Sequence, residues 1–404
     1  MPRRYPGRCP DLTWEQARAT ALRSGAPLPA VTCTLPDALG HALAAPLGAL
    51  CDLPPFDTSA MDGWAVAGAG PWRLRGDGVL AGAAEPVTLG HGTAVPVATG
   101  APLPAGATAV LRTEHAQVRD GVLRHRIADL GGPPAGRDVR PRGQECRSGE
   151  TLLPAGTTVT PAVLGLAAAA GCDHLSVHRR PSAELLVLGD ELLARGVPRG
   201  GRVRDALGPM VPPWLDCIGA RTVGVRRIGD DLRLLQEAVR SSPADVVVTT
   251  GSTAAGPVDF LHDVLRREGA VLTVDSVAVR PGHPMLLAEL PPAADGRARR
   301  LVGLPGNPLA AAAAAVTLLR PLLRRLGGHA DPEPLRLPAA ADLAGHPHDT
   351  RLLPVRHTGE GAVPLPFDGP AMLRGLALAD GLAVVPPGGA RAGAHVRFLR
   401  LPGR

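Results

Sequence analysis

The chain has 404 residues, of which 45% are apolar and 2% are aromatic, and its formal net charge is +6. The low aromatic content argues against a surface that stacks nucleic-acid bases, and the arginines are scattered among acidic residues instead of gathering on one face. The N-terminus has no apolar signal core, and the longest apolar run, residues 308–319, is too short to span a bilayer. We therefore expect a soluble, cytoplasmic protein that contacts neither nucleic acid nor membrane and prefers small anionic ligands.

The N-terminal part of the chain has helical patterns. In the stretch "TWEQ", Thr13 can cap a helix while Gln16 reaches back to it, so the spacing predicts a helix over residues 13–24. Residues 35–50 are predicted to form a second helix with its exit, and residues 159–171 a third helix.

Between these helical patterns lies a segment of different composition. Over residues 51–144, glycine and proline are frequent and the apolar runs are short, which predicts many short strands and turns. We expect this β-rich domain to be inserted into a split helical domain that is formed by residues 7–50 and 145–179.

From residue 180 onward, short apolar runs alternate with helical patterns. The predicted strands are residues 183–189, 221–228, 244–251 and 299–306. This alternation predicts a doubly wound, mostly parallel sheet over residues 180–328, and ligands of such sheets bind outside the carboxyl ends of the strands. The tail, residues 332–404, is β-like again and predicts a small separate β domain, so the whole chain is expected to be a multidomain α/β protein.

Three of these predicted strands end in polar and small residues. The residues at these ends are Gly189, Asp190 and Glu191; Gly251, Ser252 and Thr253, followed by Asp259; and Gly303, Pro305, Gly306 and Asn307. Small residues let backbone N–H groups approach a ligand, and helix N-termini add further donors. Together they suit a phosphate or another oxyanion.

Asn307 is the only asparagine in a chain that also lacks lysine. It precedes Pro308, which suits the first position of a helix, so one interpretation is a helix cap. Serine, threonine or aspartate would cap equally well, however. The alternative, which the sequence leaves open, is that the amide of Asn307 contacts a ligand.

Two loop stretches offer further polar candidates. In "PPFDTSAMDGWAV", Asp57 and Asp62 are candidate ligand or metal contacts, and the alternative is a tight turn held by aspartate hydrogen bonds. In "VAVRPGHPM", Arg280 and His283 flank a Pro-Gly turn, and the alternative is a solvated hairpin.

Carboxylates near the predicted strand ends could hold Mg²⁺, which favours oxygen ligands and keeps some of its water. The candidates are Glu191, Asp205, Asp230, Asp231 and Asp259. Each of them could equally be a surface residue.

Six stretches, taken in chain order, carry a family resemblance. They are "PPFDTSAMDGWAV", "TGAPLPAGATAV", "GDEL", "GDDLRLL", "RPGHP" and "GLPGNP". Over residues 10–404 the chain resembles the molybdopterin molybdenumtransferases, the MoeA-type enzymes that also occur as the E-domain of gephyrin. The first and last of these motifs are the specific ones.

The resemblance implies a fold and an activity. The expected fold has a split helical domain, an inserted β lid, a doubly wound α/β domain of the molybdopterin-binding type and a small C-terminal β-barrel. The expected enzyme is a homodimer that takes adenylated molybdopterin and molybdate, cleaves the adenylate with Mg²⁺, places molybdenum on the dithiolene sulfurs and releases AMP. Its active site would lie between the α/β domain of one subunit and the lid of the other. A molybdopterin adenylyltransferase and apo-molybdoenzymes are the protein partners that such an enzyme would meet.

The resemblance also implies roles for particular residues. The implied catalytic residues are Asp62, Glu145, Glu191, Asp230, Asp259 and Arg280, of which Glu191, Asp230 and Asp259 would hold Mg²⁺. The implied ligand-binding residues are Thr99, Gly251, Ser252, Thr253, Ser276, His283, Pro305, Gly306, Asn307 and Pro308.

The chain departs from the family pattern in its cations and in one loop. Ser276, Arg280 and His283 stand at positions where the family has lysines, and Arg280 keeps the charge but not the geometry of lysine. The loop "GSTAAG" replaces the family's Gly-Gly-Val-Ser-x-Gly, and "DALG" keeps only Asp205 of the family's Asp-Ser/Thr-Asn. Two hypotheses therefore remain: an active molybdenum insertase, or a divergent paralogue that binds pterin, molybdate or a partner protein without turnover.

Overall fold

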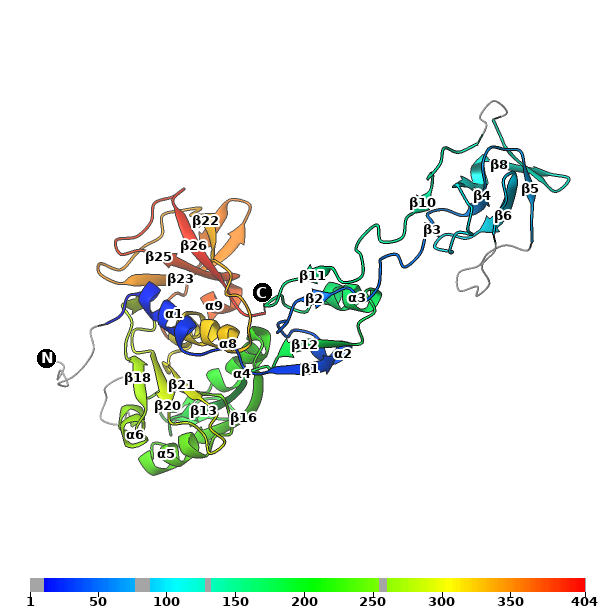
Figure 1. The fold of residues 1–404 in the computed structure, drawn as a ribbon. Coiled ribbons are helices and arrows are strands. Elements are labelled where there is room, and N and C mark those ends of the chain that lie inside the picture. The colour runs from blue at the N-terminus through cyan, green and yellow to red at the C-terminus, as the bar shows by residue number, and fades with distance from the viewer. Residues whose placement is uncertain (1–10, 77–87, 128–131, 254–259, 404) are drawn as a thin grey trace.

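The computed structural model describes residues 11–76, 88–127, 132–253 and 260–403. Its strands form three six-stranded sheets and four two-stranded pairs within these residues. Figure 1 shows an elongated molecule in which one six-stranded sheet lies at one end, the other two lie at the opposite end, and small elements lie between them. Within the described part of the chain, no helix is long and apolar enough to cross a membrane.

The first helix, α1 (Trp14–Arg23), confirms the prediction from the capping box. The side chain of Thr13 accepts a hydrogen bond from the backbone of Gln16, and the Gln16 side chain returns one to the backbone of Thr13. Trp14 is buried, and its indole Nε1 donates to Thr317 Oγ1 at 3.0 Å, which anchors α1 to a helical segment 303 residues away in the sequence.

Two separated chain segments form a small unit in the middle of the molecule (Figure 1). Its elements are β1 (Ala30–Thr34) paired with β12 (His174–His178), β2 (Leu47–Gly48) paired with β11 (Thr151–Leu153), and the helices α2 (Leu35–Ala38) and α3 (Pro161–Ala169). Both strand pairs join residues before the inserted segment to residues after it, which is why the chain leaves and re-enters this unit.

The prediction of a helix over residues 35–50 is wrong in its extent. Helix α2 ends at Ala38, and Gly40 then adopts a positive φ of 78°, a conformation that turns the chain out of the helix. Ala42 and Leu43 form bridges to Thr158 and Val177 instead. Pairing with these distant residues, which a local pattern does not reveal, decides the structure here.

The inserted segment forms a six-stranded sheet at the far end of the molecule (Figure 1), reached through the short pair β3 (Thr58–Ser59) and β10 (Val139–Arg140). In spatial order the strands are β7 (Ala109–Arg112), β4 (Gly63–Val66), β6 (Thr93–Val97), β5 (Trp72–Leu74), β9 (Val122–His125) and β8 (Ala116–Arg119), with the 3-10 turn η1 (Thr113–His115) between β7 and β8. Trp72 fills one of its cores and donates its indole N–H to the carbonyl of Gly68.

Gly63, in the motif "AMDGWAV", shows why this strand needs a glycine. A Cβ at this position would overlap the backbone carbonyl oxygen of Leu111 on the neighbouring strand β7. The close approach of β4 and β7 therefore depends on the missing side chain, and it fixes the backbone directly after Asp62.

The predicted doubly wound sheet is confirmed. Its spatial order is β16 (Arg221–Ile228), β13 (Ser182–Leu188), β17 (Val246–Thr250), β21 (Arg299–Leu304), β20 (Leu286–Leu290) and β18 (Val271–Val274). The first four strands are parallel, and the last two are antiparallel to their neighbours. Every residue of β13 and β17 is buried, as expected for central strands that are covered on both faces.

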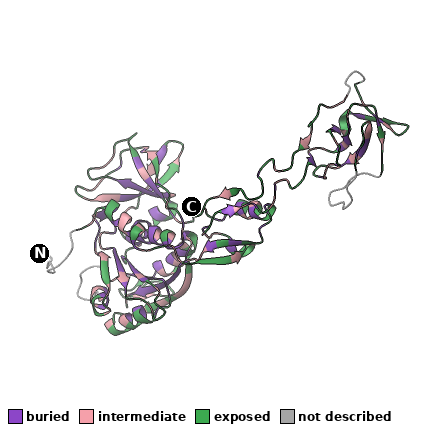
Figure 2. Cartoon of the chain, viewed as in Figure 1, coloured by how far each residue is buried: buried purple, intermediate pink, exposed green. Residues whose placement is uncertain are grey.

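Helices cover both faces of this sheet, and Figure 2 shows the buried residues concentrated there. One face packs against α1, α4 (Leu207–Ile218) and the continuous helix formed by α7 (Pro308–Ala314), the π-helical segment η2 (Ala315–Leu319) and α8 (Arg320–Leu326). The other face packs against α5 (Leu232–Ser241) and α6 (Leu261–Arg267).

A buried carboxylate ties this sheet together at the start of β17. Asp245, of which 1% is exposed, accepts hydrogen bonds from both Nη atoms of Arg179 at 2.9 and 3.0 Å and from the backbone and hydroxyl of Ser182 at 2.7 Å. Arg297 adds a further bond at 3.0 Å. Burial alone would raise the pKa of Asp245, but these donors together lower it to about 2.

We expect Asp245→Asn to destabilise the protein by about 3–5 kcal/mol, because the variant leaves the partly buried side chains of Arg179 and Arg297 without their buried counter-charge. In the wild type, the low folded-state pKa contributes about 2 kcal/mol of stability above the ordinary pKa of 3.8, and this contribution is lost as the pH falls from 3.8 towards 2. Urea unfolding at neutral and acidic pH measures both effects. Asp263→Asn, in an exposed pair with Arg266, is the matched control, and an equal loss in both variants would contradict the prediction.

The C-terminal segment forms the third sheet together with residues 279–280 of the preceding segment. Its strands are ordered β19 (Val279–Arg280), β23 (Thr350–Thr358), β25 (Gly381–Val385), β26 (His395–Arg400) and β22 (Leu335–Pro338), with β24 (Gly361–Pro364) on the other part of β23 and α9 (Arg374–Leu378) before β25. A bridge between Ala339 and Ala362 links the end of β22 to β24, so these strands curl back on one another as a small barrel. The exact domain boundaries that we derived from the sequence stay a prediction.

Candidate active site

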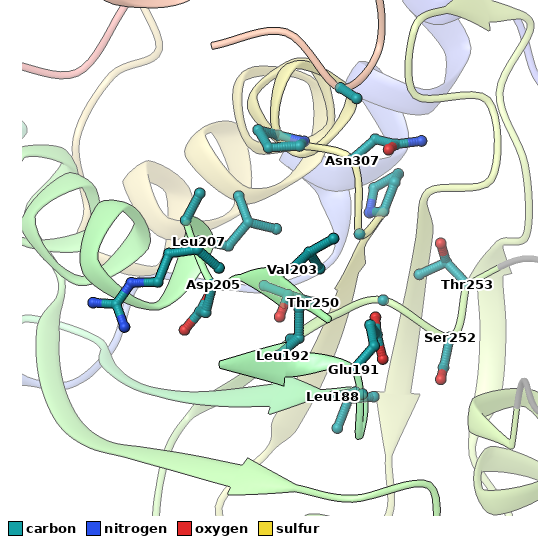
Figure 3. Close-up of a pocket in the computed structure, with 18 of the residues that line it drawn as sticks. Leu188, Glu191, Leu192, Val203, Asp205, Leu207, Thr250, Ser252, Thr253 and Asn307 are labelled. Atoms are coloured by element: carbon teal, nitrogen blue, oxygen red, sulfur yellow. The ribbon is translucent and has the colours of Figure 1, made fainter. Parts of the chain in front are cut away.

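A cavity of about 610 Å³ opens at the carboxyl ends of β13, β17 and β21 (Figure 3). Its lining comes from the loop after β13 with the pair β14 (Leu192–Leu193) and β15 (Val203–Arg204), the loops before α5 and after β17, and the starts of α4 and α7. Pro284 and the segment before α9 complete it. Of the residues named from the sequence, the cavity brings together Gly189, Glu191, Asp205, Asp230, Gly251, Ser252, Thr253, Pro305, Gly306, Asn307 and Pro308.

Of the three carboxylates that line this cavity, Glu191 and Asp230 come from the loop after β13 and the loop before α5. The side chain of Glu191 is exposed and folds back over Gly189, where a Cβ would overlap its carboxylate. Gly189 therefore leaves the space that Glu191 occupies. Among the described residues, the Glu191 carboxylate has no hydrogen-bond or ion-pair partner, so it remains available to a ligand.

The loop after β17 presents its residues in an unusual backbone conformation. Gly251 and Ser252 both have positive φ angles, of 89° and 52°. For serine this left-handed conformation is disfavoured, and such residues gather at functional sites, where the surrounding structure holds them. Figure 3 shows the side chains of Ser252 and Thr253 on this loop, and both residues line the cavity together with Glu191.

Thr250, the last residue of β17, was not singled out from the sequence. It lines the cavity, only 2% of it is exposed, and its Oγ1 has no hydrogen-bond partner among the described residues. A buried hydroxyl without a partner is costly unless a ligand or water completes it. The signal in the sequence was a pair of threonines at the end of an otherwise apolar run, "VVVTTG".

The structure separates the two interpretations of Asn307. The residue stands at the N-cap position of α7, but its side chain makes no capping hydrogen bond. The first backbone donors of the helix bind elsewhere: the N–H groups of Leu309 and Ala310 donate to the carbonyl of Pro370 at 2.9 and 3.3 Å. The amide of Asn307 is therefore not used as a cap, and the residue lines the cavity. The backbone N–H groups that we expected to be free at the start of α7 are largely occupied.

Asp205, another candidate from the sequence, already has protein partners. It is buried, its Oδ2 accepts from Arg227 at 2.6 Å, and its Oδ1 accepts from the backbone of Gly208 at 2.8 Å. These contacts indicate that Asp205 stabilises the start of α4. Arg204 next to it was missed by the sequence reasoning, although it is the only cationic side chain among the described residues that line the cavity.

The three residues at the family lysine positions do not line the cavity. Arg280 forms an ion pair with Asp349, with its Nε 2.8 Å from Oδ2. The Ser276 hydroxyl donates to Asp11 Oδ1, and His283 Nε2 lies 2.9 Å from Asp11 Oδ2. Ser276 and His283 thus hold the segment that leads into α1, although Pro284, next to His283, reaches the cavity.

The other predicted residues that the structure describes lie away from this cavity in the same chain. Asp62 and Thr99, named from separate motifs, are in contact: Asp62 Oδ1 accepts from the Thr99 backbone at 2.7 Å and from its hydroxyl at 3.0 Å. These hydrogen bonds, the backbone one first, lower the pKa of Asp62. Glu145 is exposed in a groove beside α3, and Asp259 lies outside the described residues.

The carboxylates of the cavity supply only part of the ligand set that Mg²⁺ needs. Among the described residues, no group of three or more His, Cys, Asp or Glu side chains could hold a metal by itself. Mg²⁺ is usually held by one or two carboxylates together with the phosphates of a ligand. Glu191 and Asp230, which both line the cavity, fit such a shared site, which a phosphate-bearing ligand would complete.

Family models match three consecutive parts of the chain. The MoeA N-terminal region (domain I and II) matches residues 12–171, a probable molybdopterin-binding domain matches residues 184–325, and the MoeA C-terminal region (domain IV) matches residues 336–401. The cavity lies mainly in the second part.

Similar proteins are found in several organisms. A molybdopterin molybdenumtransferase of Synechococcus elongatus is 32% identical over 86% of this chain and 88% of its own length. Molybdopterin molybdenumtransferase 2 of Mycobacterium tuberculosis is 32% identical over 75% of this chain and 76% of its own. The crystal structure of a molybdopterin biosynthesis MoeA protein from Pyrococcus horikosii, 24% identical, covers 98% of this chain and all of its own with a TM-score of 0.75, which shows a shared fold.

Proposed function

The chain belongs to the MoeA family of molybdopterin molybdenumtransferases, and from this membership we propose how its residues serve that reaction. It is a transferase of molybdenum cofactor biosynthesis. The proposed substrates are adenylated molybdopterin and molybdate. The proposed reaction cleaves the phosphoanhydride bond, releases AMP and leaves molybdenum on the two dithiolene sulfurs.

One observation carries the proposal: a single cavity joins two carboxylates to a set of uncharged hydrogen-bonding groups. Thr250 has a buried hydroxyl without a partner, Ser252 is held in a left-handed conformation, and Asn307 has an amide that caps nothing. These groups would bind and orient the phosphate and pterin parts of the substrate.

The carboxylates have a different proposed task. Glu191 and Asp230 would hold Mg²⁺ against the phosphates, where the ion neutralises the charge that develops as the anhydride breaks. Asp259 is the third proposed ligand and lies outside the described residues. Arg204 would supply the cationic side chain of the cavity, in place of the family lysines that are absent here.

We propose a homodimer in which Asp62 and Thr99 complete the site of the partner subunit. In one chain these residues belong to the far sheet, at the end of the molecule opposite to the cavity (Figure 1). The low pKa of Asp62 keeps its carboxylate charged at neutral pH, ready for a cation or a donor of the bound substrate. The catalytic roles of Glu145 and Arg280 are also proposals, because they rest on the resemblance alone.

A cytoplasmic location and two kinds of protein partner complete the proposal. The described cysteines are all free thiols, which suits a reducing compartment. A molybdopterin adenylyltransferase would supply the substrate, and apo-molybdoenzymes would receive the product.

Replacing Thr250 by valine separates a ligand-binding role from a structural one. Valine has the same shape, and Thr250 Oγ1 has no partner among the described residues, so the unfolding midpoint should stay the same or rise. If the hydroxyl binds the substrate, KM should increase by about tenfold. Thr222→Val is the matched control, since its hydroxyl is also buried without a partner but does not line the cavity. Equal kinetics of the Thr250 variant and the wild type would contradict the role.

The proposed activity is tested by mixing the purified chain with adenylated molybdopterin, molybdate and Mg²⁺, and by following AMP release together with reconstitution of an apo-molybdoenzyme. We expect both products. Tight pterin binding without AMP release would instead support the second hypothesis, a non-catalytic paralogue. In that case Ser276→Lys would be the first change to examine, because it restores a family lysine.

A further inference from the structure

A second cleft, of about 360 Å³, lies between the start of α1 and the C-terminal sheet. It is separate from the cavity described above and shares none of its lining residues. Its polar lining includes Arg336 and Arg397, His348 and His395, and Thr13 and Glu15 from the start of α1. The inference from this cleft does not depend on the proposed function.

The two arginines of the cleft face each other across neighbouring strands. Arg336 on β22 is the direct cross-strand partner of Arg397 on β26. Like charges directly opposite each other destabilise a sheet. His395 is two residues before Arg397 on the same strand, so its side chain lies on the same face. The sheet thus gathers cationic and imidazole groups at one place, at a cost in stability.

The protein itself compensates only part of this charge. Among the described residues, Glu15 is the single acidic one that lines the cleft, and its Oε1 pairs with Arg397 Nη1 at 2.9 Å. Arg397 is further held over the ring of Trp14, 5.8 Å from its centroid. Arg336 is exposed to the cleft and has no ion pair or side-chain hydrogen bond to any described residue. One guanidinium is therefore positioned by neighbours, and the other is open to a ligand.

The shape and lining of the cleft indicate the class of ligand. A guanidinium binds phosphate through two parallel hydrogen bonds, and the ring nitrogens of His348 and His395 offer further donors. Pro386 and Pro387 add an apolar wall. Small-molecule sites have volumes of roughly 300–1,000 Å³, so this cleft is at the lower end of that range. We propose that it binds a small organic phosphate, with the phosphate group between Arg336 and Arg397 and the organic part against the prolines.

The proposal is tested by equilibrium dialysis of the full chain with labelled glycerol 3-phosphate and, separately, with labelled inorganic phosphate at constant ionic strength. Arg336→Gln removes the unpaired guanidinium, and we expect it to weaken binding of the ester by at least about tenfold. Arg356→Gln is the matched control, because Arg356 is exposed on the same sheet and does not line the cleft. It should bind like the wild type.

Three outcomes would overturn the proposal: no binding of the ester to the wild type at millimolar concentration, equal binding by Arg336→Gln and the wild type, or equal affinity for inorganic phosphate and for the ester. The last result would mean that the apolar wall contributes nothing and that no organic phosphate is selected. Unfolding midpoints show whether the variants are folded. If Arg336→Gln is not, His395→Gln examines the same face of the cleft with the same expected loss.

Discussion

Replacing Glu191 by glutamine is expected to abolish AMP release while leaving the chain folded. The carboxylate is exposed in the cavity and has no partner within the described part of the protein, so its charge contributes little to stability. Glutamine keeps the size of the side chain but is a poor ligand for Mg²⁺. If Glu191 holds the ion against the substrate phosphates, AMP release should fall by about a hundredfold or more.

Two comparisons make this result specific. Glu237→Gln removes an exposed carboxylate from α5, outside the cavity, and should leave AMP release unchanged. Titration with Mg²⁺ should show a higher concentration for half-maximal activity in Glu191→Gln but not in Glu237→Gln. Normal AMP release with normal Mg²⁺ dependence in Glu191→Gln would remove Glu191 from the proposed metal site.

Patterns that repeat over short distances allowed much of the fold to be predicted. The capping box at Thr13 and the buried runs that became β13 and β17 are local signals, and the structure confirms them. The alternation of strands and helices gave the parallel sheet and placed Glu191, Gly251 and Asn307 at one edge of it. The local pattern is sufficient here because the right-handed connection of parallel strands leaves few other topologies.

Contacts between distant residues account for most of what the sequence did not reveal. Residues 39–50 pair with segments more than a hundred residues away, so their helical pattern was misleading. The carbonyl of Pro370 occupies the donors at the start of α7, which leaves the amide of Asn307 without a capping role. Thr250 was overlooked because a threonine that ends a strand is common, and only the packed structure shows that its hydroxyl lacks a partner.

Motifs predicted Asp62 and Thr99 as site residues, but they did not predict where the two residues lie relative to the cavity. The sequence named Asp62 and Thr99 from separate motifs, and the structure joins them by two hydrogen bonds. It also places them at the opposite end of the molecule from the cavity in which Glu191 lies (Figure 1). If both carboxylates serve one reaction, the second must come from another subunit, because a single chain does not bring them together in this structure.

Co-expression of Asp62→Ala and Glu191→Ala chains is therefore expected to restore activity that neither variant has alone. In each pure homodimer both sites lack one required carboxylate. In a mixed dimer, one site combines Glu191 of the first chain with Asp62 of the second and is intact, whereas the other site lacks both. Random pairing makes half of the dimers mixed, so about a quarter of all sites should be active.

AMP release is measured for each pure variant and for the co-expressed mixture. As a control, the two purified variants are mixed immediately before the assay, so that their subunits have no time to exchange. Distinct affinity tags on the two chains allow the mixed dimer to be isolated, and its activity per dimer should be about half that of the wild type. Asp62 is exposed, and its hydrogen bonds to Thr99 are local to the far sheet, so both variants should remain folded. An inactive mixed dimer would contradict a site shared between subunits, because both carboxylates would then have to act from the same chain. Full activity of Asp62→Ala alone would instead remove Asp62 from the reaction.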